Sequence, residues 1–161
     1  MRLAAPGWSL HEGPVLEKGI TPMRSFVAEP MAWGRLFLVG DAAHIVPPTG
    51  AKGLNLAVAD VVVLAQAMAD WCRTGETAGL SAYSDRCLGR VWRVQEFSTM
   101  MTTLMHRDRS GGAFARRLQQ ARQTYVVHSG AMRTSLAENY VGLPLDWSGA
   151  GRRPPPAERG P

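Results

Sequence analysis

Residues 34–55, GRLFLVGDAAHIVPPTGAKGLN, join two apolar segments through a loop of small residues, prolines and glycines. The first segment, Leu36–Val39, is a continuous apolar run and predicts a short strand that is buried on both faces. The second, Leu54–Trp71, has apolar residues on nearly every side and predicts a helix packed deep inside a larger body. This order places the loop where open α/β folds bind ligands.

The remaining segments are predicted to be mostly helical. MRSFVAEPM, residues 23–31, reads as a second strand or an extended segment, whereas apolar residues at three- and four-residue steps predict helices over Leu80–Leu104, Phe114–Tyr125 and Met132–Tyr140. One or two strands do not form a stable sheet by themselves, because a sheet generally needs at least three. We therefore expect a piece of a larger fold, which in isolation exposes a large apolar surface.

Composition excludes several classes of function. The 161 residues carry a net charge of +5, but the arginines are scattered and do not interleave with aromatic residues, which argues against a nucleic-acid partner. Cys72 and Cys87 are the only cysteines, lack metal-ligand spacing and are expected to be reduced thiols. The start of the chain has no apolar signal region, and four polar residues interrupt the longest apolar stretch: Asn55, Asp60, Gln66 and Asp70. These features predict a cytoplasmic protein without a membrane partner.

The loop offers chemistry suited to a polyol that also carries anionic groups. Asp41, at the end of the predicted strand, can accept hydrogen bonds from hydroxyls, although a lone Gly-Asp pair is more often a structural cap. Gly50 and Gly53 allow close backbone approach, and the N–H groups near Leu54 and Asn55 open a helix.

Two further residues of the loop, Lys52 and His44, carry basic side chains. Lys52 adds a positive charge beside the helix start, but TGAKGLN is not a phosphate-binding P-loop, because Lys52 stands between Ala51 and Gly53 instead of preceding Ser or Thr. His44, which has no metal-ligand partners at a suitable spacing, is expected to be structural.

Three motifs together resemble the FAD-dependent aromatic hydroxylases. GRLFLVGDAAHIVPPTGAKGLNLAVAD resembles the second flavin-contacting motif of that family, and RSFVAEPM and AENYVGLP resemble the segments that accompany it in members that hydroxylate 4-hydroxybenzoate. The resemblance covers about residues 13–145. It implies an α/β fold in the intact family, with a Rossmann-like FAD domain and a substrate domain, of which this chain is a mostly α-helical part with one or two strands near its N-terminal end.

The resemblance also implies roles for individual residues. Asp41 would bind the ribityl hydroxyls of FAD, the backbone at Gly50, Gly53, Leu54 and Asn55 would face the flavin, and Lys52 would supply positive charge to its reduced form. Pro48 and Thr49 would line the ring of a small aromatic acid, Tyr140 would pass the phenolic proton outward, and Arg24 would contact the co-substrate NADPH. Without this resemblance, we would interpret Tyr140 only as the last of the apolar positions along one face of a helix.

The implied reaction converts 4-hydroxybenzoate to 3,4-dihydroxybenzoate with FAD, NADPH and oxygen, in an enzyme expected to be a homodimer. No GxGxxG motif follows a leading strand, so we expect the C-terminal part of such an enzyme, inactive by itself. Two alternatives stay open: another phenolic-acid hydroxylase of the superfamily, or a non-catalytic helical module for association.

The predicted organisation has five parts. They are an irregular leader (1–13), a remnant of the substrate-domain connection (14–34), the FAD-contacting motif with its buried helix (35–75), a helical region (76–147) and a disordered tail (148–161).

Overall fold

A computed structural model describes residues 13–20, 22–107 and 111–144 of the chain. The segments near the N-terminal end form two small antiparallel ladders, in which β1 pairs with β4 and β2 pairs with β3. The strands and the two 3-10 turns between them are β1 (Phe26–Val27), β2 (Ala32–Trp33), β3 (Leu36–Phe37), η1 (Gly40–Ala42), β4 (His44–Ile45) and η2 (Pro48–Gly50).

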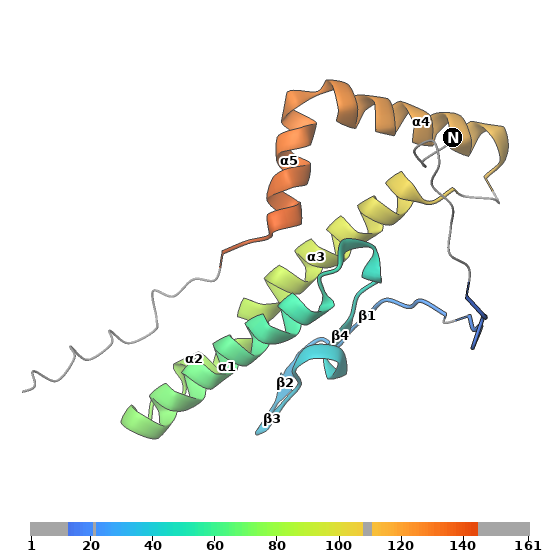
Figure 1. Cartoon of the computed structure of the whole chain (residues 1–161). Coiled ribbons are helices and arrows are strands. Elements are labelled where there is room, and N and C mark those ends of the chain that lie inside the picture. The colour runs from blue at the N-terminus through green and yellow to red at the C-terminus, as the bar shows by residue number, and fades with distance from the viewer. Residues whose placement is uncertain (1–12, 21, 108–110, 145–161) are drawn as a thin grey trace, which may run out of the picture.

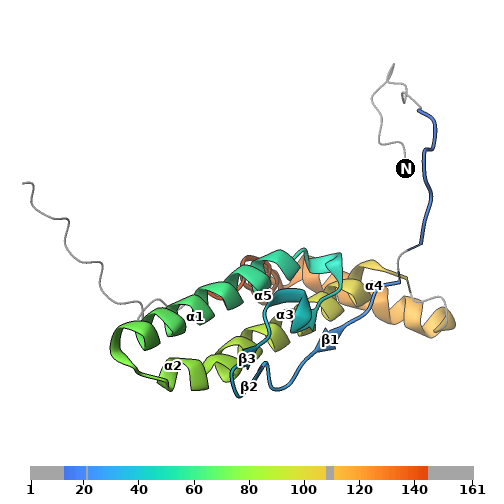
Figure 2. The ribbon, with the colours of Figure 1, turned by 90° about the horizontal axis from the view of Figure 1, so that it is seen from below.

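Five helices make up the rest of the described chain: α1 (Gly53–Thr74), α2 (Ala78–Ser81), α3 (Tyr83–Met105), α4 (Gly112–His128) and α5 (Gly130–Val141). α1 and α3 lie side by side and run in opposite directions, joined at one end through the short α2 (Figures 1 and 2). Gly75, whose φ of 77° is left-handed, ends α1 and starts this reversal. α4 and α5 follow at the far end of α3, where α5 turns back toward its middle (Figure 1).

The hydrophobic core lies between the strand segment and the α1–α3 pair. Its fully buried members come from all of these elements: Met31, Ala43, Leu56, Tyr83, Cys87 and Val91. The Tyr83 hydroxyl donates to the Leu38 carbonyl at 2.7 Å, which satisfies a polar group inside the core. The segment around η1 and β4 is therefore fixed against α1 and α3 on its inner side.

The helical prediction is confirmed and the strand prediction is only partly correct. The helix expected over residues 80–104 is divided at Ala82 into α2 and α3, and the strand expected over Leu36–Val39 contains only Leu36 and Phe37. Burial of that strand on both faces is wrong for this chain, because Leu36 is 61% exposed and β3 pairs only with β2. The predicted tail, residues 148–161, and residues 1–12 of the leader lie outside the described residues.

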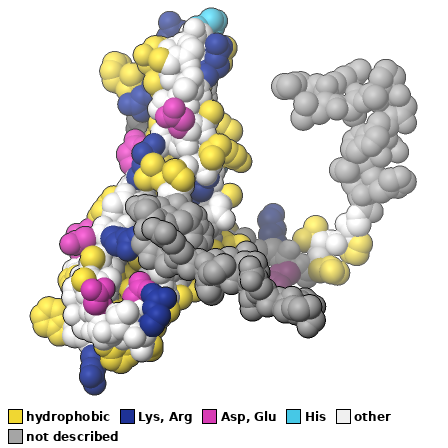
Figure 3. Space-filling model, turned by 90° about the vertical axis from the view of Figure 1, so that its left-hand side faces the viewer, with side chains coloured by type: hydrophobic (Ala, Val, Ile, Leu, Met, Phe, Trp, Pro, Cys, Tyr) yellow, Lys and Arg dark blue, Asp and Glu magenta, His cyan; other side chains and the backbone are white. Residues whose placement is uncertain are grey.

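Large apolar side chains are exposed along both the core helices and the C-terminal helices. Leu54 is 77% exposed, Trp92 51% and Phe114 80%. Figure 3 shows hydrophobic side chains at the surface of the face it presents, between scattered basic and acidic side chains. This agrees with the expected exposure of an apolar surface.

α1 is also long and apolar enough to cross a bilayer by length and composition alone. Core helices of soluble proteins pass the same test. The middle of α1 carries Asp60, which is 1% exposed and packed against the chain's own turn η1.

Candidate functional site

The loop between β4 and α1 rests on α3. The hydroxyls of Thr49 and Thr102 are 2.8 Å apart, and a Cβ placed on Gly50 would lie 3.0 Å from Ser98 Oγ and 3.2 Å from the Phe97 ring. A methyl group here would be tighter than ordinary van der Waals contact, so glycine favours this close approach of the η2 backbone to α3. Pro48 and Thr49 are thereby held in one place on α3.

The carbonyl of Pro48 can still accept a second hydrogen bond. It accepts the N–H of Ala51 at 2.9 Å, and Ala51 adopts the left-handed conformation with φ of 51°. A carbonyl oxygen has two lone pairs, so one of them remains for a ligand hydroxyl. Pro48 itself is exposed.

Asp41 lies on the η1 turn that precedes β4. The residue is exposed, and among the described residues no hydrogen bond engages its carboxylate. Gly40, before it, has a φ of 60°, and its Cα faces Ala57 of α1 so closely that a Cβ would lie 3.1 Å from the Ala57 Cβ. The turn is thus anchored on its inner side and presents a free acceptor on its outer side.

α1 begins with backbone donors that the chain itself leaves open. The first backbone bond at this end runs from the Leu56 N–H to the Lys52 carbonyl at 3.0 Å, and no side chain caps the helix. The preceding N–H groups of Gly53, Leu54 and Asn55 therefore offer a partly positive surface to anionic or carbonyl oxygens. A Cβ on Gly53 would meet no heavy atom within 4 Å, which leaves this backbone accessible.

Lys52 connects the loop to α5. Its side chain is 8% exposed, and Nζ donates to the Tyr140 carbonyl near the C-terminal end of α5. Nζ also lies 5.0 Å from the Tyr140 ring centroid and 5.9 Å from that of Phe97, and the two rings pack edge to face at 6.2 Å. This arrangement is a cation held by two aromatic rings and a helix end.

Six of the ten predicted site residues divide among three places. Lys52, Leu54 and Asn55 line one cavity of about 410 Å³ with Arg90, Arg93 and Asn139, among others. Arg24 and Thr49 line another, of about 340 Å³. Asp41 stays apart on its exposed turn.

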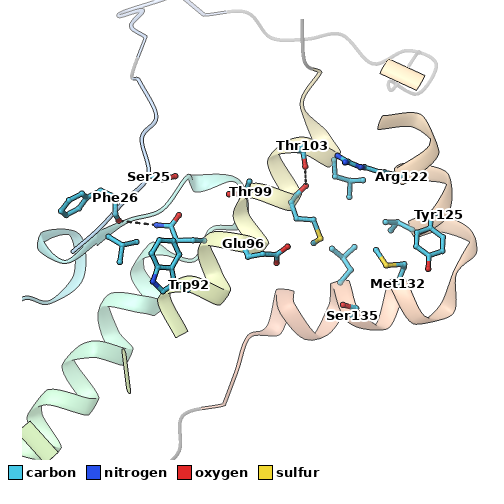
Figure 4. A pocket seen from close by; sticks show the side chains of 16 residues that line it. Ser25, Phe26, Trp92, Glu96, Thr99, Thr103, Arg122, Tyr125, Met132 and Ser135 are labelled. Atoms are coloured by element: carbon cyan, nitrogen blue, oxygen red, sulfur yellow. Dashed lines mark hydrogen bonds between the residues drawn. The ribbon is translucent and has the colours of Figure 1, made fainter. Parts of the chain in front are cut away.

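A larger cavity, of about 770 Å³, is lined by none of the predicted residues. Figure 4 shows its lining side chains arriving from β1, α3, α4 and α5, with Trp92, Glu96, Arg122 and Tyr125 among them. Size alone therefore does not identify the site. Among the described residues, no group of three or more His, Cys, Asp or Glu side chains is placed to hold a metal ion.

A buried polar cluster lies beneath the η1 turn. Asp60 Oδ2 accepts from the Gly40 N–H at 3.1 Å and pairs with His44 Nε2 at 2.7 Å, so His44 is structural, as expected. Burial, and after it the negative charge of Asp60, raises the pKa of the Cys87 thiol to about 12. Burial also raises the pKa of the Tyr83 hydroxyl, with a further contribution from Cys87.

Several residues of this region are missed by reading the sequence alone. Phe97, Thr102 and Asn139 sit on helices whose spacing indicates only ordinary packing. Asp60 leaves a signal in the sequence, an acid inside a mainly apolar helix. Its partners, His44 and Gly40, are 16 and 20 residues away and can be identified only from the fold.

The two cysteines should differ strongly in alkylation by iodoacetamide. At pH 9 a thiol with a pKa of about 12 is only about 0.1% thiolate, and Cys87 is also 3% exposed, so Cys87 should remain unmodified while exposed Cys72 reacts. Peptide mass spectrometry measures both sites, and denatured chain, in which both should react, is the control. Equal modification of the two native thiols at pH 9 would contradict the buried position of Cys87.

The chain matches known proteins over most of its length. The family model described as "FAD binding domain" matches residues 3–98. The p-hydroxybenzoate hydroxylase of Acinetobacter baylyi is 52% identical over 134 residues, which is 83% of this chain and 33% of that enzyme. The aklavinone 12-hydroxylase of Streptomyces purpurascens is 44% identical over 64 residues, covering 39% of this chain and 12% of that enzyme.

A solved structure shares the fold. The rebeccamycin biosynthetic enzyme RebC, determined with reduced flavin, superimposes with a TM-score of 0.52 at 24% identity, over 71% of this chain and 23% of that chain. The chain thus spans about a third or less of the length of each of these relatives.

Proposed function

This chain belongs to the FAD binding domain family, and we propose that it is the part of a flavin-dependent aromatic monooxygenase that contacts the flavin and the substrate ring. The observation that carries this proposal is that residues 40–55 are held in place yet keep unused hydrogen-bonding groups. Gly40 and Thr49 are hydrogen-bonded to α1 and α3, whereas Asp41, the Pro48 carbonyl and the first N–H groups of α1 can still bind a ligand.

The open groups fit FAD. The Asp41 carboxylate suits the ribityl hydroxyls, and the backbone at Gly50, Gly53, Leu54 and Asn55 suits the carbonyl oxygens of the flavin ring. Bound FAD, reduced by NADPH, would supply the oxygen-activating chemistry. Arg24, which is exposed beside Thr49, is our candidate contact for NADPH.

We propose 4-hydroxybenzoate as the substrate. The 52% identity to p-hydroxybenzoate hydroxylase supports this choice over other phenolic acids, which remain the second candidate. Pro48 and Thr49 would position the ring, with the Pro48 carbonyl accepting the phenolic hydrogen bond. Tyr140 would take the phenolic proton and pass it to solvent, because its ring is packed on Phe97 while the residue as a whole remains 58% exposed.

The proposed setting is a cytoplasmic homodimer that needs no nucleic acid or membrane. The helices α3 and α4 are the candidates for the dimer contact, since Trp92 and Phe114 are 51% and 80% exposed on them. A purely associative role for these helices is the alternative from another class of function.

The test uses a hybrid in which residues 13–144 replace the matching segment of the A. baylyi p-hydroxybenzoate hydroxylase. The hybrid should bind FAD and hydroxylate 4-hydroxybenzoate. Failure to bind FAD, in a hybrid that folds by circular dichroism, would contradict the proposed function. Activity on a different phenolic acid only would support the second candidate.

Within this hybrid, Asp41→Ala should raise the Kd for FAD by roughly 10- to 100-fold. The reason is the loss of hydrogen bonds to a charged acceptor, each of which contributes about 1.5–3 kcal/mol. Flavin fluorescence measures the affinity. Glu76→Ala, an exposed acid in the α1–α2 turn, is the matched control and should leave the Kd unchanged. An Asp41→Ala hybrid with unaltered FAD affinity would remove Asp41 from the site.

A further inference from the structure

Asp60 is an unusual residue at the centre of α1. Its carboxylate side chain is only 1% exposed, and the helix around it is mainly apolar. A carboxylate so deeply buried is costly unless hydrogen-bond donors surround it. The donors that it receives come from the η1 turn and from β4, so their geometry shows what the carboxylate does.

Both donors converge on one oxygen. Asp60 Oδ2 accepts the Gly40 N–H at 3.1 Å and the His44 side chain, through Nε2, at 2.7 Å. Gly40 and His44 flank Asp41, Ala42 and Ala43, so a single atom of α1 holds both ends of this short segment. His44 is itself 1% exposed, and its backbone position is fixed by pairing with Val27 of β1.

The turn has little freedom to satisfy Asp60 in another conformation. Gly40 has a left-handed φ of 60°, and its Cα lies against Ala57, one helical turn before Asp60. The Ala43 N–H closes the turn by donating to the Gly40 carbonyl at 2.8 Å. Asp41 is thereby directed outward, and its direction depends on where the Gly40 N–H is held.

We infer that Asp60, together with His44, is a positioning residue for the cofactor site: it fixes the η1 turn so that Asp41 faces the ribityl hydroxyls of FAD. This inference rests on the proposed function. Asp60 does not touch the cofactor in this scheme, and it acts only through Gly40 and His44. The ordinary alternative is that Asp60 stabilises the core without any effect on FAD.

The first measurement uses the full 161-residue chain and does not involve FAD. In Asp60→Leu, which keeps the side-chain volume but accepts no hydrogen bond, amide hydrogen exchange in the peptide covering residues 39–46 should become at least about tenfold faster, the effect of losing roughly 1.4 kcal/mol of hydrogen bonding. Asp60→Asn keeps an oxygen acceptor and should restore slow exchange. Ala67→Gly, two turns along the same helix, is the matched control, because it weakens α1 without touching the turn.

The second measurement is FAD affinity in the hybrid. The Kd should rise at least about tenfold in Asp60→Leu, return to within about threefold of the parent in Asp60→Asn, and stay unchanged in Ala67→Gly. If Asp60→Leu does not fold, His44→Phe is measured in its place. This variant removes one of the two donors and keeps an aromatic ring, so the Kd for FAD should rise by a smaller factor.

The outcomes separate the inference from the proposed function. Unchanged exchange in Asp60→Leu would show that Asp60 does not hold the turn and would overturn the inference. Faster exchange with unchanged FAD affinity, or an equal loss of affinity in Ala67→Gly, would overturn it in favour of a core-stabilising role. A parent hybrid that binds no FAD would refute the proposed function before any variant is made, and the inference with it.

Discussion

Replacing Tyr140 by Phe in the hybrid should uncouple NADPH oxidation from hydroxylation. Without the hydroxyl, the phenol of the substrate loses its proton less readily, and its ring is less reactive toward the activated oxygen. General acid–base catalysis typically contributes 10²–10⁴-fold, so we expect the rate of product formation to fall at least about tenfold while NADPH is still consumed. The missing product should appear as hydrogen peroxide.

The same variant should leave packing nearly intact. The edge-to-face contact between the Tyr140 and Phe97 rings and the Lys52 bond to the Tyr140 carbonyl do not involve the hydroxyl. A purely structural role predicts unchanged product per NADPH and a stability loss on the order of 1 kcal/mol. Tyr125→Phe, at a tyrosine of similar exposure on α4, is the control. Parent-like coupling in Tyr140→Phe would exclude Tyr140 from proton transfer.

Alanine substitutions at Gly50 and Gly53 should have opposite effects on stability, although only three positions separate them. At Gly50 a Cβ would lie 3.0 Å from Ser98 Oγ and 3.2 Å from the Phe97 ring, so either the loop or these two side chains must shift by a few tenths of an ångström. We expect a loss of roughly 1–3 kcal/mol, with weaker FAD binding. At Gly53 a Cβ would meet nothing within 4 Å, and alanine in this first turn of α1 should stabilise by a few tenths of a kcal/mol up to about 1 kcal/mol.

Denaturant unfolding of the two hybrids, followed by circular dichroism, measures both changes. Gly53→Ala serves as the matched control for Gly50→Ala, since it introduces the same methyl group in the same loop region. Equal stability of the two variants would show that the loop does not rest on α3 as described.

The sequence predicted the helices and the loop well because both depend on local patterns. Apolar spacing predicts α1, α4 and α5 within a few residues, and the density of Gly, Pro and Asp between residues 40 and 53 identifies the loop. The strand at Leu36 was predicted less well, because burial of a strand depends on its neighbours, and β3 has only β2 beside it.

The contacts that organise the candidate site could not be read from the sequence. Lys52 meets the Tyr140 carbonyl across 88 positions of the chain, and Thr49 meets Thr102 across 53. Such pairs depend on how α1, α3 and α5 cross. Lys52 could be predicted as a cation near the flavin, but its contact with two aromatic rings follows only from that crossing.

The support of the loop by α3 has a consequence for engineering substrate choice. Gly50 and Thr49 take their positions from Phe97, Ser98 and Thr102, which lie about 50 residues further along the chain. A loop transplanted from a hydroxylase with another substrate would meet an α3 surface shaped for different side chains. Exchange of residues 46–55 should therefore succeed only when the α3 residues beneath them are exchanged at the same time.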